Sequence, residues 1–269
     1  AVYLAWRGKV RAGALLVLVA VLLNVLPDFV WPQAGGGSYL GDWIGTYMVK
    51  VGQSAPGIWD SDLILNQSLS GLINRLVQSG IPLTAEELPS ALAKLPESTT
   101  LAIRLLTYGA GMGLLVITAW QFWPDRLSPT PRSAARGNEA AGDAVAANGA
   151  NLQTAVEASA IICLMLLLSP MSSKAHYVAL LLPCFVLTRA FVENRLNRKL
   201  WLPPLVVLGP LTAKGITGKA LGDLMLAWGF PTWFALLLLV AIWRLPATGF
   251  FTASRQRGIL PSLRVLVRN

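Results

Sequence analysis

The chain has 269 residues, of which 54% are hydrophobic and 13% are charged, and its mean hydropathy is +0.57. Soluble domains carry roughly 25% charged residues, so this composition excludes a soluble globular protein and predicts an all-α, polytopic membrane protein. The net charge of +9 does not indicate nucleic-acid binding, because the basic residues stand at the ends of apolar runs and do not cluster with aromatic residues.

The first strong apolar run covers 12–30, close to the roughly 20 residues of a spanning helix. Three basic residues stand before it, so the positive-inside rule places its start in the cytoplasm. Because the chain opens without a methionine, we expect it to be the C-terminal portion of a longer protein. The segment 32–100 is then an external loop, in which the helical spacing of apolar residues over 63–77 predicts a helix in the membrane interface.

The run 101–123 is the second predicted span. The segment 124–154 is rich in alanine, glycine and asparagine, which predicts a flexible cytoplasmic loop. Two shorter runs, 155–168 and 177–191, flank the polar stretch 169–176. Arginines lie before the first run and after the second, so both outer ends belong in the cytoplasm and the pair predicts a hairpin whose turn lies outside.

The next apolar run, 200–211, contains three prolines and predicts a broken helix, which is tolerated where neighbours satisfy the freed backbone groups. The last predicted span covers 224–243, and the tail 244–269 is basic and therefore cytoplasmic. The sides alternate consistently for about six crossings. We predict a single transmembrane domain, 1–269, in the plasma membrane of a bacterial cell.

Two polar clusters fall on the same, external side of this topology. The first contains Asn66, Gln67, Ser68 and Arg75, and the second contains Ser169, Ser172, Ser173, Lys174, His176 and Tyr177. Polar groups at the membrane boundary are costly and usually line a cavity or a pathway. An enzyme acting on a sugar carried by a lipid phosphate needs cations to hold the phosphate and amides or hydroxyls to bind the sugar. The clusters contain these groups.

Structural alternatives remain open for each cluster. His176 can be a boundary histidine whose ring is satisfied by a backbone carbonyl, and Lys174 and Arg75 can extend toward the membrane surface. Asn66 or Ser68 can cap the helix that follows. The two cysteines have no metal-type spacing and are interpreted as small buried hydrophobes, so no metal site and no cofactor are predicted.

The sequences of the two clusters contain motifs that are similar to those of a known family. The first motif is Asn66-Gln67-Ser68-Leu69 followed by Gly71 and Arg75. The second is Leu168-Ser169-Pro170 followed by Ser172, Lys174, His176 and the run 180–183. With a weaker match at 218–223, they resemble the C-terminal portion of glycosyltransferase family 87 over about 60–240. These are multispanning GT-C enzymes, alpha-mannosyltransferase-like, that use polyprenyl-phosphate sugars.

The resemblance implies an inverting transfer of a sugar, of the mannose or pentose class, from a polyprenyl-phosphate donor to a glycolipid or glycan acceptor at the outer membrane face. It implies that His176 and Lys174 contact the donor phosphate as catalytic groups. The residues implied in substrate binding are Asn66, Gln67, Ser68, Arg75, Ser169, Ser172, Ser173 and Tyr177. An acidic general base is required, and the resemblance places it upstream of this chain.

Two other classes of function compete with an enzyme. A transporter or flippase of a lipid-linked or small solute also uses broken helices and polar groups inside the membrane. The polar groups here gather on one side, however, and no inverted repeat is evident, which favours the enzyme. A noncatalytic membrane scaffold would tolerate free substitution of the polar turn. The expected partners are membrane lipid, the polyprenyl-phosphate sugar and the acceptor.

Overall fold

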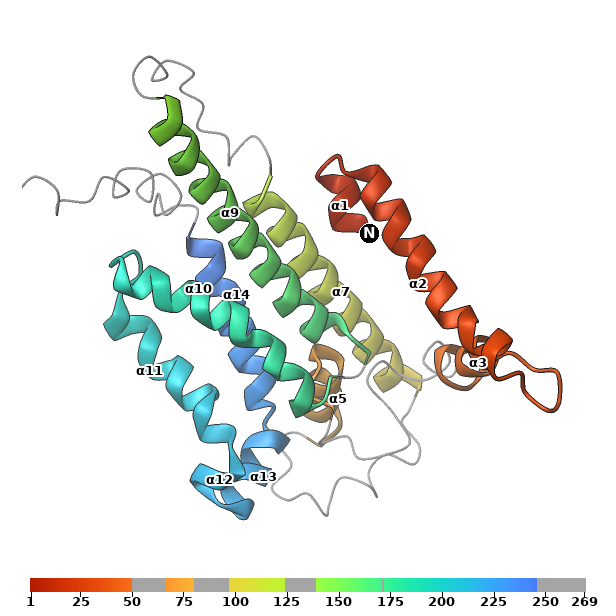
Figure 1. Cartoon of the computed structure of the whole chain (residues 1–269). Helices are drawn as coiled ribbons and strands as arrows, with labels where there is room; N and C mark the ends of the chain where they lie inside the picture. Colours follow the sequence, from red (N-terminus) through yellow and green to blue (C-terminus); the bar gives the residue numbers. More distant parts are fainter. Residues whose placement is uncertain (50–65, 80–96, 124–138, 171, 246–269) are drawn as a thin grey trace, which may run out of the picture. The chain divides into compact units, whose positions relative to one another are not determined.

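The protein is represented by a computed structural model (Figure 1), which describes residues 1–49, 66–79, 97–123, 139–170 and 172–245. All regular structure within these residues is helical, which confirms the predicted all-α class. The chain divides into two compact units, Ala1–Ser54 and Ala55–Asn269, whereas the sequence predicts a single domain.

The first unit contains the helices α1 (Val2–Trp6), α2 (Val10–Val30) and α3 (Tyr39–Trp43) and the π-helical turn η1 (Ile44–Met48). Helix α2 corresponds to the first predicted span, and its leucine and valine side chains are exposed on all sides, as expected of a helix surrounded by lipid. Near its end, Asp28 accepts hydrogen bonds from the Ser38 hydroxyl and the Tyr39 N–H, both at 2.7 Å. These bonds hold α3 against the end of α2.

The second unit carries the candidate site and is built from eight α-helices and two 3₁₀ helices among its described residues. The α-helices are α5 (Leu69–Ser79), α7 (Glu97–Gln121), α9 (Glu139–Leu168), α10 (Leu181–Val192), α11 (Arg198–Leu208), α12 (Lys214–Thr217), α13 (Lys219–Ala227) and α14 (Phe230–Arg244). The 3₁₀ helices are η2 (Lys174–Leu180) and η3 (Pro210–Thr212).

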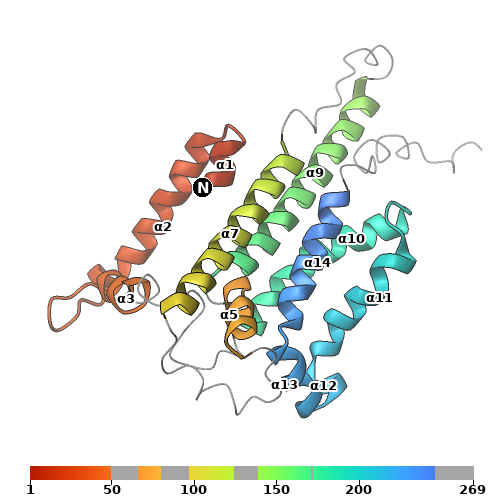
Figure 2. The same cartoon turned by 180° about the vertical axis from the view of Figure 1, so that it is seen from behind.

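Helices α9 and α14 form the core of this unit and lie side by side in Figures 1 and 2. The buried residues of α9 recur every three or four positions, which gives the helix one continuous inward face. They include Val156, Ala160, Cys163 and Leu167. Small residues on both helices, such as Ala160 and Ala235, are fully buried and allow the close approach that membrane helices use in place of a hydrophobic driving force.

Helix α14 is also joined to α7 by a hydrogen bond within the apolar layer. The indole Nε1 of Trp243 donates to the hydroxyl oxygen of Thr118 at 3.2 Å. The same hydroxyl donates to the carbonyl of Leu114 at 2.7 Å, so the hydroxyl proton and the indole N–H both have an acceptor. This bond links the last turns of α7 and α14.

Four stretches of the described chain are long and apolar enough to cross a membrane: 10–30, 98–121, 151–168 and 174–192. A fifth is obtained if α13 and α14 count as one span, although they are bent by 60°. The predicted crossing at 200–211 corresponds to α11, whose 11 residues extend only about 16 Å against the roughly 30 Å of hydrocarbon in a bilayer. The described residues therefore contain four or five candidate spans, and the sixth predicted crossing stays a prediction.

Two predicted boundaries differ from the structure. Helix α9 begins at Glu139, so 139–154 is helical and not part of a loop, while 124–138 lies outside the described residues. The alanine content of this stretch favours the helix, because alanine has the highest helix propensity. The predicted continuous span 224–243 is instead divided at Gly229, whose φ of +70° ends α13 and turns the chain into α14.

Candidate functional site

The two polar clusters predicted from the sequence contact each other directly. The backbone N–H of Gln67 donates to the carbonyl of Ser172 at 2.6 Å. The side chain of Asn66 bonds to the same turn twice: its Nδ2 donates to the carbonyl of Pro170 at 3.0 Å, and its Oδ1 accepts from the N–H of Ser172 at 3.2 Å. The segment before α5 is therefore attached to the turn between α9 and η2.

Gln67 also connects this contact to the bend between α13 and α14. Its carbonyl oxygen accepts hydrogen bonds from the Tyr177 hydroxyl and from the Thr232 hydroxyl, the latter at 2.6 Å. Its side-chain Nε2 donates to the carbonyl of Leu226 at 2.9 Å. Gln67 is fully buried, so each of these bonds satisfies a group that water does not reach. We refer to Asn66, Gln67, Ser68, Arg75, Ser172, Tyr177 and Thr232 as the polar junction.

Ser68 caps helix α5, as one of the sequence alternatives predicted. Its hydroxyl accepts from the N–H of Gly71 at 3.2 Å, which is the N-cap bond, and also bonds to the hydroxyl of Ser70 at 2.8 Å. The Oδ1 of Asn66 accepts from the N–H of Ser68 at 3.1 Å. Gly71 is required at this point, because a methyl group there would overlap the carbonyl of Asn66.

Arg75 extends the junction along α5 and is almost completely buried. Its Nη1 donates to the carbonyl of Asn66 at 2.7 Å. Burial lowers the pKa of Arg75 from 12.5 to about 10, and the nearby Tyr177 acts in the opposite direction. The guanidinium is therefore still charged at neutral pH. On the same helix, Leu76 and Val77 are exposed, so the polar side of α5 faces into the protein and part of its apolar side faces out.

Lys174 and His176 lie at the exposed edge of the junction. The Nδ1 of His176 accepts a hydrogen bond from the backbone N–H of Ser173 at 3.0 Å. A backbone N–H can only donate, so Nδ1 is unprotonated and a neutral ring carries its proton on Nε2. The ring is therefore bonded to a backbone N–H, not to the carbonyl that the structural alternative supposed. Lys174 donates from Nζ to the carbonyl of Thr212 at 2.7 Å.

The three remaining predicted residues are the serines of the turn after α9: Ser169, Ser172 and Ser173. Ser172 is buried and donates from its hydroxyl to the carbonyl of Leu166 at 2.7 Å. Ser169 and Ser173 are half-buried, and the N–H of Ser169 donates to the carbonyl of Met165 at the end of α9. The structure thus joins six of the predicted residues directly: Asn66, Gln67, Ser68, Arg75, Ser172 and Tyr177. Asn66, Gln67, Ser68 and Ser172 use their polar groups mainly on one another and on backbone.

Three polar residues near or within the spans were not identified from the sequence. Thr232 belongs to the junction. Glu157 is buried in α9 and accepts from Gln153 at 2.9 Å. It lies 11 positions before the last residue of α9, about 16 Å along the helix, and so far from the junction. Arg104 lies within the predicted span 101–123. A polar or charged residue inside an apolar run was the available signal in each case.

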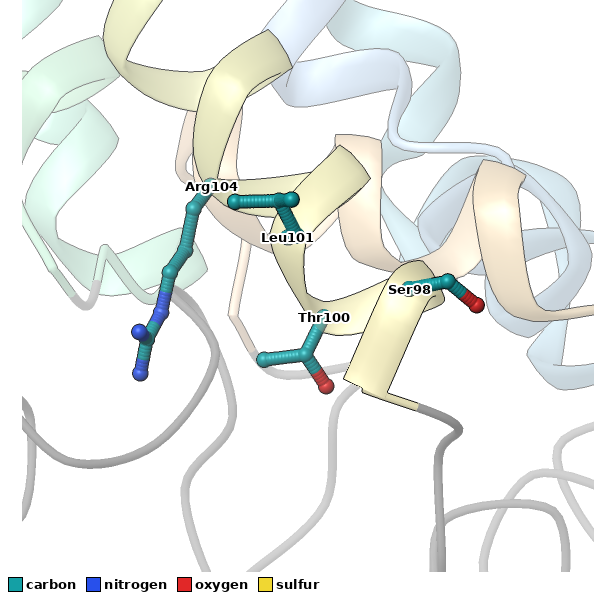
Figure 3. A pocket seen from close by; sticks show the side chains of 4 residues that line it. All are labelled: Ser98, Thr100, Leu101 and Arg104. Carbon is teal, nitrogen blue, oxygen red and sulfur yellow. The ribbon is translucent and has the colours of Figure 1, made fainter.

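Arg104 lines a pocket at the beginning of α7. The cavity has a volume of about 330 Å³ and is lined by Ser98, Thr100, Leu101 and Arg104. Figure 3 shows Arg104 and Thr100, one turn apart, extending on the same side of the helix. Among the described residues, no three His, Cys, Asp or Glu side chains gather as a metal ion would require.

Comparisons of the chain with protein-family models, with curated protein sequences and with solved structures found no match.

Proposed function

We propose that this protein is part of a membrane glycosyltransferase of the GT-C type. It would transfer a sugar of the mannose or pentose class from a polyprenyl-phosphate donor to a glycolipid or glycan acceptor at the outer face of a bacterial plasma membrane. The observation that supports the proposal is the contact between the two motifs, in which the N–H of Gln67 donates to the carbonyl of Ser172 at 2.6 Å. Motifs that are about 100 residues apart in sequence thus form one buried polar junction.

The proposed transfer reaction uses the two side chains at the exposed edge of the polar junction, Lys174 and His176. The acceptor oxygen attacks the anomeric carbon, the bond from that carbon to the phosphate oxygen breaks, and the phosphate leaves with the electron pair. The ammonium of Lys174 and the Nε2–H of His176 would stabilise the charge that develops on the phosphate. The acceptor proton passes to a carboxylate base, which the resemblance places upstream of this chain. Asn66, Gln67 and Arg75 are buried, so they would act by holding the turn that carries these two groups in position.

The proposal is tested by sugar transfer in membranes that contain the protein and a radiolabelled polyprenyl-phosphate sugar. His176→Ala and Lys174→Ala are expected to lower the transfer rate about 100-fold, the typical effect of removing one group that stabilises developing charge. The control is Lys199→Ala, which removes an exposed lysine at the beginning of α11 and should leave transfer unchanged. Near-normal transfer by His176→Ala, with normal membrane insertion, would overturn the assignment.

A transporter or flippase is the second candidate, and one observation favours it. Helices α13 and α14 form a pair bent by 60°, and discontinuous helices of this kind form substrate sites in many transporters. Reconstitution into liposomes distinguishes the two functions: a transporter moves a labelled lipid-linked sugar across the bilayer without transferring the sugar to an acceptor, whereas the enzyme releases polyprenyl phosphate.

A further inference from the structure

The bend between α13 and α14 is held in place by the neighbouring helix. The two axes meet at 60°, and Gly229 at the bend adopts a left-handed φ of +70°. A Cβ at Gly229 would lie 2.7 Å from Leu72 Cδ1 and 3.1 Å from Arg75 Nη2, so α5 packs directly against the bend. Because α5 contacts the bend, the 60° angle between α13 and α14 is fixed.

This inclination determines how much of the membrane each helix can cross. The 15 residues of α14 extend about 22 Å, which is shorter than the roughly 30 Å of hydrocarbon. The nine residues of α13 are about 13 Å long, and at 60° to α14 they advance about 7 Å along its axis. If α14 crosses the membrane, α13 lies in the outermost part of the lipid layer on that side.

The surface of α12 and α13 has the character of an element in the lipid headgroup layer. Ile216 is 65% exposed, and Leu221, Leu224 and Trp228 are exposed at intervals of three and four positions, which places them along one side of α13. Lys219, the first residue of α13, is exposed as well. Apolar residues on one side, a tryptophan at the deeper end and a lysine at the shallower end are typical of interfacial helices.

One contact braces this element internally, and another attaches it to the rest of the second unit. Lys214 of α12 forms an ion pair with Asp223 of α13 at 2.5 Å. Gly222 makes room for it, because a Cβ there would lie 2.7 Å from Lys214 Cγ. Lys174 donates to the carbonyl of Thr212 in η3, which joins the element to the turn that carries His176. The element is thus a fixed part of the protein surface.

We propose that residues 210–227, from η3 to the end of α13, form an amphipathic shelf that lies in the headgroup layer of the membrane. The side chains of Ile216, Leu221 and Leu224 contact the upper acyl chains, and Lys219 contacts lipid phosphates. The occupant of this surface is bilayer lipid, because α13 and α14 together are long and apolar enough to cross a membrane and the exposed lysine is complementary to phosphate. The proposal is independent of catalysis, and a protein without transferase activity would have the same shelf.

The test is the depth of spin labels in lipid nanodiscs that contain phosphatidylglycerol and phosphatidylcholine. Cysteines are placed one at a time by Lys219→Cys, Leu221→Cys and Leu224→Cys in a Cys184→Ala background; Cys163 is kept because it is 0% exposed. Collision with oxygen and with a water-soluble nickel complex gives the depth. Leu18→Cys on α2 is the control for the bilayer interior, and a free water-soluble spin label in the buffer is the control for water.

We expect Leu221 and Leu224 labels within about 5–10 Å of the headgroups, with depth increasing in the order 219, 221, 224 and with all three shallower than the Leu18 label. Labels at 221 and 224 that collide with nickel as freely as the free label in the buffer would place the shelf in water and overturn the proposal. Labels as deep as the Leu18 label, or no increase of depth along α13, would also overturn it.

Discussion

The close contact at the bend of α14 gives a quantitative prediction for Gly229→Ala. An L-residue at φ +70° costs about 1–2 kcal/mol of stability. The added methyl also lies 2.7 Å from Leu72 Cδ1, and overpacking of this kind costs about 1–3 kcal/mol. We therefore expect Gly229→Ala to lower the free energy of unfolding by about 2–5 kcal/mol in total.

A double-mutant cycle separates the two contributions. Leu72→Ala removes the nearest atom that the new methyl would meet and leaves Arg75 Nη2 at 3.1 Å, so the cost of Gly229→Ala should fall toward the backbone contribution of about 1–2 kcal/mol in that background. The assay is unfolding of the purified protein in mixed micelles with increasing denaturing detergent, followed by circular dichroism. Equal costs of Gly229→Ala in the two backgrounds would refute the reasoning, because they would show that Leu72 of α5 does not press against the bend.

Two further predictions concern hydrogen bonds of the polar junction and use the same unfolding assay. Tyr177→Phe and Thr232→Val should each lower the free energy of unfolding by about 1 kcal/mol, since the carbonyl of Gln67 keeps one donor in either variant. The double variant should lose about 1–3 kcal/mol more than the sum, because the buried carbonyl then has neither donor. Additive losses would contradict the shared acceptor. Ser68→Ala should lower the free energy of unfolding by about 1 kcal/mol, because the N-cap bond to Gly71 is lost. Ser68→Thr is the matched control, because it retains the hydroxyl. Equal losses of stability in the two variants would contradict the cap.

Topology allowed the sequence to predict that the two polar clusters share one side of the membrane, because basic residues stand at the ends of the apolar runs. The structure adds a direct contact between them, in which Asn66 and Gln67 bond to Ser172. The partners within the junction could not be predicted. Asn66 and Gln67 bond largely to the carbonyls of Pro170, Ser172 and Leu226, and a backbone carbonyl is present at every residue, so no sequence pattern marks the ones that will accept.

The bend at Gly229 was missed for a different reason. The run 224–243 is apolar on both sides of the bend, and hydrophobicity alone cannot distinguish one span from two helices at an angle. A local signal was present: Gly229 is followed by Pro231, a proline in the first turn of α14. Glycine before a helix and proline at its first positions are typical of a helix start. The burial of Arg75, in contrast, depends on how α5 packs and has no such signal.

The position of Thr232 and Trp243 in the last described helix has a consequence for synthesis. A ribosome makes α5, α7 and α9 well before α14, so during that interval the carbonyl of Gln67 lacks the Thr232 hydroxyl and Thr118 lacks the Trp243 indole. Both the junction and the bond between α7 and α14 are therefore completed only when α14 inserts. A nascent chain halted before residue 230 would hold inserted helices but an unfinished junction, and would be the form most exposed to membrane quality control.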